Sequence, residues 1–161
     1  MDFESGYRPL QSPQTHRVRG IELDLTWRAN ERMEWIASGA LMDNKLSEAN
    51  DENLSASMVA DNTLGMLGRF SFYESWAYYL GVNYVSDRSI DTPGEAKLGN
   101  YTLVDMTLEK TLESHTDKWQ IRLIAKNMLN EYRPSVATPG IRVTPTPGRQ
   151  ALLKITYAFQ K

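Results

Sequence analysis

The sequence has no cysteine among its 161 residues, so it can form neither a disulfide framework nor a thiolate metal site. It also has no apolar run near the roughly 20 residues that a transmembrane helix requires. Its 18 lysine and arginine residues and 20 acidic residues give a net charge of -2, which leaves no basic surplus for nucleic-acid binding. The first residues lack the pattern of a secretory signal, a basic segment followed by an apolar core.

A mean hydropathy of -0.48 is typical of a soluble chain, but a membrane β-barrel gives the same average. In such a barrel the polar residues that face the lumen offset the apolar residues that face the lipid. The periodicity decides between the two. Residues 1–17 contain Gly6, Pro9 and Pro13 and are predicted to be a loop or tail.

From Val18 onward, apolar and polar residues alternate with a period of two, which a strand requires and a helix excludes. Ile21, Leu23 and Leu25, for example, alternate with acidic residues. We expect seven strands of about ten to thirteen residues, the length that a tilted strand needs to cross a bilayer. They lie around residues 20–29, 33–41, 63–72, 76–84, 104–109, 119–126 and 153–159.

The connections between these segments alternate in length. Tight turns are predicted at 29–31, 73–75 and 114–117, and long loops at 43–62, 86–100 and 130–147. Short periplasmic turns and long extracellular loops are typical of bacterial outer-membrane barrels. The pattern therefore predicts an all-β fold, an antiparallel up-and-down transmembrane β-barrel segment of about seven strands, with the end of the chain on the short-turn side.

Strict alternation also predicts which side chains face lipid, because a charge near mid-membrane costs about 2–4 kcal/mol. The set expected outside is Ile21, Leu23, Leu25, Leu64, Met66, Leu80, Val82, Leu108, Ile121, Leu123, Leu153 and Ile155. The set expected on the concave side is Glu22, Asp24, Arg69, Tyr79, Asp105, Arg122 and Lys154. Between the fifth and sixth strands, charge complementarity favours a register with Glu109 opposite Arg122, Asp105 opposite Lys126 and Leu108 opposite Leu123.

All four tryptophans lie beside a short turn and on the apolar face of their strands. Aromatic rings collect at the water–lipid boundaries of membrane proteins. We therefore interpret these residues as a membrane-interface girdle, although strands favour aromatic residues in any protein. The girdle consists of Trp27, Trp35, Trp76 and Trp119.

Four segments together resemble the C-terminal end of TonB-dependent receptors, the plugged barrels of about 22 strands in the outer membrane. Val18-Arg19-Gly20-Ile21-Glu22 resembles a recurrent strand opening of that family, and 99–105 (Gly-Asn-Tyr-Thr-Leu-Val-Asp) resembles another. The segment 125–132 (Ala-Lys-Asn-Met-Leu-Asn-Glu-Tyr) resembles the run before the last long loop. Residues 147–159 resemble the closing strand, and the order and spacing of the four are those of the family.

The resemblance implies a C-terminal part of a TonB-dependent receptor barrel over 18–161, with the plug domain absent, in the outer membrane of a Gram-negative bacterium. The expected function is ferric-siderophore uptake, for which the TonB system acts through the plug region. The fragment is not expected to transport alone. Its closing strand would be a signal for the outer-membrane assembly machinery, carried by Leu153, Ile155, Tyr157 and Phe159. Gln160 and Lys161 depart from the family, whose chains stop at the final aromatic residue.

No catalytic constellation is present, and neither an enzymatic step nor a cofactor is expected. His16 and His115 have no partner at metal or triad spacing and are interpreted as surface histidines. The acidic segment from Asp43 to Asp61 lacks the glycine and terminal glutamate of a calcium loop and is interpreted as a solvated loop. Four lumen-facing residues are candidates for contact with an anionic chelate, although ordinary lumen polarity explains them as well. They are Arg69, Tyr79, Arg122 and Lys126.

Two other hypotheses are consistent with the same alternation of apolar and polar residues. In the first, residues 1–17 supply an eighth strand, and the chain is a self-contained small outer-membrane barrel with a structural or adhesive role. In the second, the apolar face points inward and the chain is a soluble carrier barrel. An outer-membrane barrel partitions into detergent, whereas a carrier remains in buffer.

Overall fold

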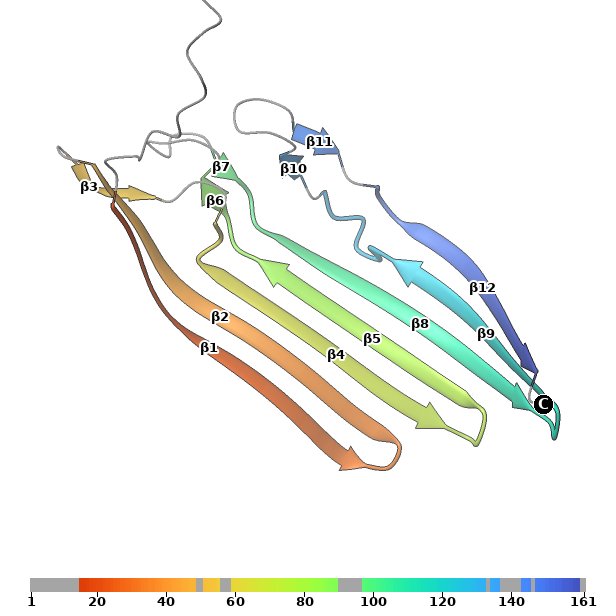
Figure 1. Ribbon diagram of the computed structural model, residues 1–161. Helices are drawn as coiled ribbons and strands as arrows, with labels where there is room; N and C mark the ends of the chain where they lie inside the picture. The colour runs from red at the N-terminus through yellow and green to blue at the C-terminus, as the bar shows by residue number, and fades with distance from the viewer. Residues whose placement is uncertain are drawn as a thin grey trace, which may run out of the picture.

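The computed structural model describes residues 15–48, 51–55, 59–89, 97–132, 134–136, 143–145 and 147–159, which are strands and their connections (Figure 1). Within these ranges no helix has the length and apolar character needed to cross a membrane. The predicted tail up to residue 14, the centres of the long loops, and Gln160 and Lys161 lie outside the described residues.

Seven antiparallel strands form the main sheet, and each pairs with its neighbours in chain order. They are β1 (Thr15–Asn30), β2 (Met33–Glu48), β4 (Asn62–Phe72), β5 (Trp76–Val85), β8 (Tyr101–Glu113), β9 (Asp117–Lys126) and β12 (Gln150–Phe159). The short β3 (Asp51–Ser55) adds to β2. The predicted all-β, up-and-down arrangement is confirmed.

Short turns join the strands at one end of the sheet and long connections join them at the other (Figure 1). β12 runs toward the turn end, as predicted. The long connections contain short strands that the sequence did not indicate. They are β6 (Arg88–Ser89) paired with β7 (Lys97–Leu98), and β10 (Pro134–Val136) paired with β11 (Val143–Pro145).

The first hairpin is longer than predicted. β1 begins at Thr15 inside the expected tail, and β2 continues through residues 43–48, which were expected to be loop. The turn also lies slightly later than predicted, because Asn30 is still paired with Met33. The Asn30 side chain stabilises this placement, since its Oδ1 accepts a hydrogen bond from the Arg32 N–H at 2.8 Å.

The register places the two predicted sets of side chains on opposite faces. Following the pairs from strand to strand, Glu22, Asp24, Arg69, Tyr79, Asp105, Arg122 and Lys154 fall on one surface, the polar face. The twelve predicted lipid-facing residues fall on the other, the apolar face. Many of these are exposed, with Ile21 at 73% and Leu153 at 66%.

The polar face carries the most buried side chains of the sheet centre. Ala77 and Glu109 lie opposite each other on β5 and β8, and both are 7% exposed. Neighbouring side chains crowd together on the inside of a curved sheet and spread apart on its outside. This burial therefore agrees with the prediction that the polar face is the concave one.

The predicted register between β8 and β9 is also confirmed, with Glu109 opposite Arg122 and Leu108 opposite Leu123. The ladder ends at Met106 and Ala125, one position before the expected pair of Asp105 and Lys126. Among the described residues, the Asp105 carboxylate interacts with the backbone of Asn127. That contact depends on the loop conformation, which the alternation of residues cannot predict.

The two outermost strands each pair on one side within the described part of the chain. β1 pairs with β2, β12 pairs with β9, and the sheet is open between them. Every residue of β12, and every residue of β1 from His16 on, is exposed. Each strand therefore presents a row of backbone N–H and C=O groups along an outer edge that no described strand pairs.

Candidate functional site

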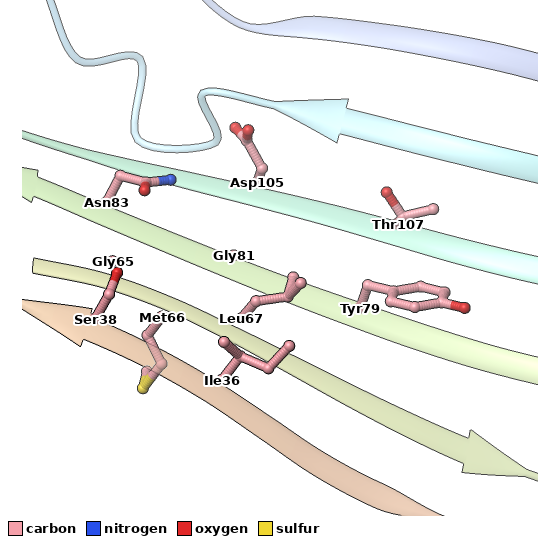
Figure 2. A pocket seen from close by; sticks show the side chains of 10 residues that line it. All are labelled: Ile36, Ser38, Gly65, Met66, Leu67, Tyr79, Gly81, Asn83, Asp105 and Thr107. Atoms are coloured by element: carbon pink, nitrogen blue, oxygen red, sulfur yellow. The ribbon is translucent and has the colours of Figure 1, made fainter. Parts of the chain in front are cut away.

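A hollow of about 380 Å³ lies on the polar face, across β2, β4, β5 and β8. Figure 2 shows the side chains that border it. The hollow exists because Gly65 and Gly81 occupy central positions of β4 and β5 and project no side chain. Gly81 lies opposite Leu67 on one side and Asp105 on the other. A Cβ at Gly81 would be 3.9 Å from the Asp105 Cβ, which is an ordinary van der Waals contact, so a methyl group could be added there without a clash.

The lining of this hollow is mixed. Tyr79, Asn83, Asp105 and Thr107 supply polar groups, and Ile36 and Leu67 form an apolar pair directly opposite each other. Met66 also borders the hollow but belongs by register to the apolar face. The polar groups can donate and accept hydrogen bonds, but they include neither a nucleophile paired with a base nor a set of metal ligands. The hollow is therefore suited to contact with another surface or a solute.

Asn127 joins the base of the last long connection to the sheet. It is 6% exposed and has a φ of 50°, a left-handed conformation that asparagine tolerates better than most residues. Its backbone N–H donates to Asp105 Oδ1 at 2.8 Å, and its side-chain oxygen accepts from the Glu131 N–H at 2.8 Å. Its Nδ2 donates to the carbonyls of Glu131 (2.9 Å) and Pro147 (3.4 Å). Asn127 therefore fixes both ends of this connection.

The four polar-face residues proposed as contacts for an anionic chelate are not brought together. Arg69 and Tyr79 are opposite each other on β4 and β5, whereas Arg122 and Lys126 lie on β9. The Arg122 guanidinium forms an ion pair with Glu109, whose side chain is 10% exposed. A buried carboxylate requires such a partner, so the charge of Arg122 is already neutralised. A single anion-binding cluster of these four residues is therefore not formed.

The four tryptophans all lie on the apolar face near the turn end, as predicted. Trp27 and Trp35 are directly opposite each other, and Trp76 stacks on Phe72 with ring centroids 6.2 Å apart. The ring of Trp119 packs against that of Tyr157, with the ring centroids 4.4 Å apart. These rings lie near the turn end of the sheet on every main strand except β8, and we call them the aromatic belt. This placement fits a membrane-interface girdle, which remains a prediction.

The belt crosses the strands obliquely. Followed from strand to strand, the residues directly opposite one another in the row of Trp35 end at Met106 on β8. Trp119 on β9 lies opposite Leu112, which is six residues further along β8 than Met106. From Trp35 to Trp119 the belt therefore shifts by six residues, or about 20 Å, along the strands. Over the same distance it crosses four strand spacings, or about 19 Å, from β2 to β9. If the belt is level, the strands tilt by roughly 45°, the value typical of membrane barrels.

The strand proposed as an assembly signal has its four named residues on the apolar face. Leu153 and Ile155 are 66% and 57% exposed, and Tyr157 and Phe159 are 43% and 75% exposed. The Tyr157 hydroxyl donates to Asp117 Oδ1 at 2.6 Å, across the β9–β12 pair. The strand is thus apolar, accessible and aromatic at its end, and its role in assembly is still untested.

The two histidines and the acidic segment lie in strands and connections, and Asp43 belongs to β2 and not to the expected loop. His16 is an exposed residue of β1, and His115 lies in the β8–β9 turn. Asp43 and Asp61, the ends of the acidic segment, contact Lys45 and Asn44 respectively. No group of three metal-ligating side chains occurs among the described residues.

Two features escaped the sequence analysis. Lys110 lies on the apolar face with its ammonium 4.5 Å from the centre of the Trp76 ring. In the sequence, Lys110 interrupts the alternation of apolar and polar residues along β8, and this interruption could have identified it. Asn127 entered the sequence analysis only as a member of the segment 125–132, without a structural role of its own. The spacing of Asn127 and Asn130, which both have positive φ, pointed to a structured turn.

Comparisons with known proteins agree with this geometry. The family model described as "TonB dependent receptor-like, beta-barrel" matches residues 2–128. The sequence matches none of the curated proteins. Among solved structures, the chain is similar to BauA, the ferric preacinetobactin receptor from Acinetobacter baumannii (TM-score 0.74, 17% identity, 88% of this chain). It is also similar to the siderophore receptor PiuA from the same species (TM-score 0.75, 14% identity, 90% of this chain).

At these identities the two structures establish the fold, and this chain covers 22% of each of them. The family match carries the assignment further, because it extends over most of the sequence. It also agrees with the separation of polar and apolar faces and with the oblique aromatic belt. The chain therefore belongs to the TonB-dependent receptor-like β-barrel family.

Proposed function

We propose that residues 18–161 form the C-terminal part of an outer-membrane receptor that takes up ferric siderophores. Members of this family are outer-membrane proteins of Gram-negative bacteria, and they are transporters. The observation that carries the proposal is the register of the main sheet, which gives one face to polar residues and the other to apolar residues. With the polar face on the concave side, such a sheet fits a position between a watery lumen and lipid.

In this function the chain supplies barrel wall, with the polar face toward the lumen and the long connections outside the cell. The siderophore enters from outside, and the TonB system acts through the plug region of the receptor. The similarity to BauA and PiuA supports a ferric chelate as the ligand. We expect the outer-membrane assembly machinery to recognise β12.

The open sheet favours a larger barrel over the self-contained alternative. A closed eight-stranded barrel requires an additional strand between β1 and β12, whereas the described sheet leaves both strands exposed. In hydrocarbon these unpaired backbone groups would cost several kcal/mol each. We therefore propose that the chain alone does not transport.

Uptake of a radiolabelled ferric siderophore by a receptor-deleted bacterium tests both parts of the proposal. The full-length gene product that contains this chain should restore uptake in a TonB-positive strain and not in a strain without TonB. The chain alone should give no uptake in either strain. TonB-dependent uptake by the chain alone would overturn the fragment proposal. Absence of uptake by the full-length product with a panel of siderophores would overturn the proposed ligand class.

A further inference from the structure

On the first hairpin the polar and apolar faces exchange character near the loop end. Up to Ile21 and Leu41, which are opposite each other, the outward positions are apolar. Beyond that row the same face carries Arg19 opposite Asp43, and then Arg17 opposite Lys45. The opposite face now carries apolar residues such as Val18. A strand that continues across a membrane boundary shows this exchange, because its outward side chains leave the hydrocarbon.

The outward side chains beyond the exchange are mostly cationic. We call Arg17, Arg19 and Lys45 the basic rim, and all three are exposed. The Lys45 ammonium is 3.6 Å from a carboxylate oxygen of Asp43, so one charge of the rim is balanced within the hairpin. Arg17 and Lys45 are directly opposite each other, an arrangement of like charges that destabilises a strand pair. The rim would gain stability from a bound anion.

The depth of the basic rim agrees with a lipid headgroup. Arg17 is ten residues from Trp27 on the same strand, which corresponds to about 34 Å along the strand and about 24 Å along the membrane normal at a 45° tilt. The apolar band of such barrels is about 25 Å tall. The aromatic belt at Trp27 and the basic rim therefore mark the two boundaries of one hydrocarbon layer.

We propose that the basic rim binds the phosphate groups of a lipid in the outer leaflet, an inference that rests on the proposed outer-membrane location. Arginine guanidinium groups form paired hydrogen bonds with phosphate oxygens. Directly below the rim, Ile21 and Leu41 are 73% and 62% exposed on the same face. A phosphorylated lipid satisfies both surfaces at once, with its phosphates on the rim and its acyl chains on these side chains. A free phosphate ion satisfies only the first.

The turn-end boundary of the apolar face differs from the rim. Among the described strand residues there, Lys110 and Asp117 are the charged side chains of that face. Lys110 lies against the Trp76 ring, and Asp117 accepts the Tyr157 hydroxyl. One cation and one anion give no net positive charge, so this boundary offers no comparable phosphate site.

Lipid binding by the full-length protein, purified from outer membranes in a non-ionic detergent, tests the inference. The probe is lipid A, a glycolipid with two phosphates, titrated while the bound species are counted by native mass spectrometry. Combined Arg17→Gln, Arg19→Gln and Lys45→Gln substitutions should weaken binding about 100-fold, since each basic residue near an anionic surface contributes roughly a factor of five. Arg28→Gln is the matched control, because Arg28 is an exposed cation of β1 on the polar face. It should change binding less than twofold.

Two further arms identify the chemical group that binds. Dephosphorylated lipid A should bind the unsubstituted protein as weakly as lipid A binds the triple variant. Inorganic phosphate at millimolar concentration should not displace the lipid. Equal binding of lipid A by the triple variant and the Arg28→Gln control would overturn the inference, as would full displacement by inorganic phosphate.

The outcome is separable from that of the proposed function. The triple variant should still fractionate with outer membranes and support siderophore uptake, since the rim lies on the lipid side of the wall. If the triple variant fails to fold, the single Arg17→Gln variant and the salt dependence of lipid A binding give the answer. Binding that does not weaken between 50 and 500 mM salt would refute a phosphate-binding rim. A full-length protein absent from outer membranes would instead refute the proposed function.

Discussion

The clearest test of the membrane orientation uses two neighbouring residues of β5. Leu80 lies on the apolar face, in the row of Trp35 and Met106, and Tyr79 lies on the polar face opposite Arg69. Leu80 is four residues from Trp76, which places it roughly 10 Å above the aromatic belt at a 45° tilt. That depth is close to the middle of an apolar band about 25 Å tall.

At this depth Leu80→Arg should lower the free energy of unfolding by about 2–4 kcal/mol, a factor of roughly 30 to 1,000 in the folding equilibrium. Tyr79→Arg should cost less than about 1 kcal/mol, because its side chain points into a watery lumen. Guanidinium titration of the full-length protein refolded in phosphatidylcholine vesicles, followed by tryptophan fluorescence, measures both values. Equal costs for the two substitutions, or a larger cost for Tyr79→Arg, would refute the assignment of faces.

Three further predictions concern the ion pair, the loop base and the closing strand. Glu109→Gln should destabilise the full-length protein by about 1–3 kcal/mol in the same titration, because it leaves the half-buried Arg122 without a carboxylate. Adding Arg122→Gln should recover part of this loss of stability. Asn127→Ala should make the last long connection more sensitive to limited proteolysis, since it removes the side-chain hydrogen bonds at both ends. Asn127→Gly should increase this sensitivity less, because glycine accepts the positive φ. Phe159→Ala should reduce the amount of protein in outer-membrane fractions, whereas Tyr157→Phe, which removes only the hydroxyl bonded to Asp117, should not. Equal fractionation of the two variants would contradict an assembly role for the terminal aromatic residue.

Much of the main sheet could be predicted because its cause is local. The alternation of Ile21, Leu23 and Leu25 with acidic residues defines a strand with one lipid-compatible face, whatever surrounds it. Turn positions were less accurate, since the first hairpin closes one residue later than expected. The reason is the hydrogen bond that the Arg32 N–H donates to the Asn30 side chain, together with a bulge between Arg28 and Asn30, and periodicity reveals neither.

The register between β8 and β9 could be predicted for a different reason. Several registers keep the apolar face intact, but few also place opposite charges together, and the pair of Glu109 and Arg122 distinguishes one of them. The same reasoning failed at Asp105, where the ladder ends. There the loop backbone at Asn127 supplies a closer partner than Lys126.

The sequence by itself determined the strand period, the alternation of short and long connections, and the face to which each side chain belongs. These depend on nearest neighbours along one strand and on the energy of placing a charge in lipid. The tertiary structure decided what depends on several strands at once. The hollow at Gly65 and Gly81, the oblique aromatic belt and the opposition of Arg17 and Lys45 all arise from cross-strand register, which brings together residues far apart in the chain.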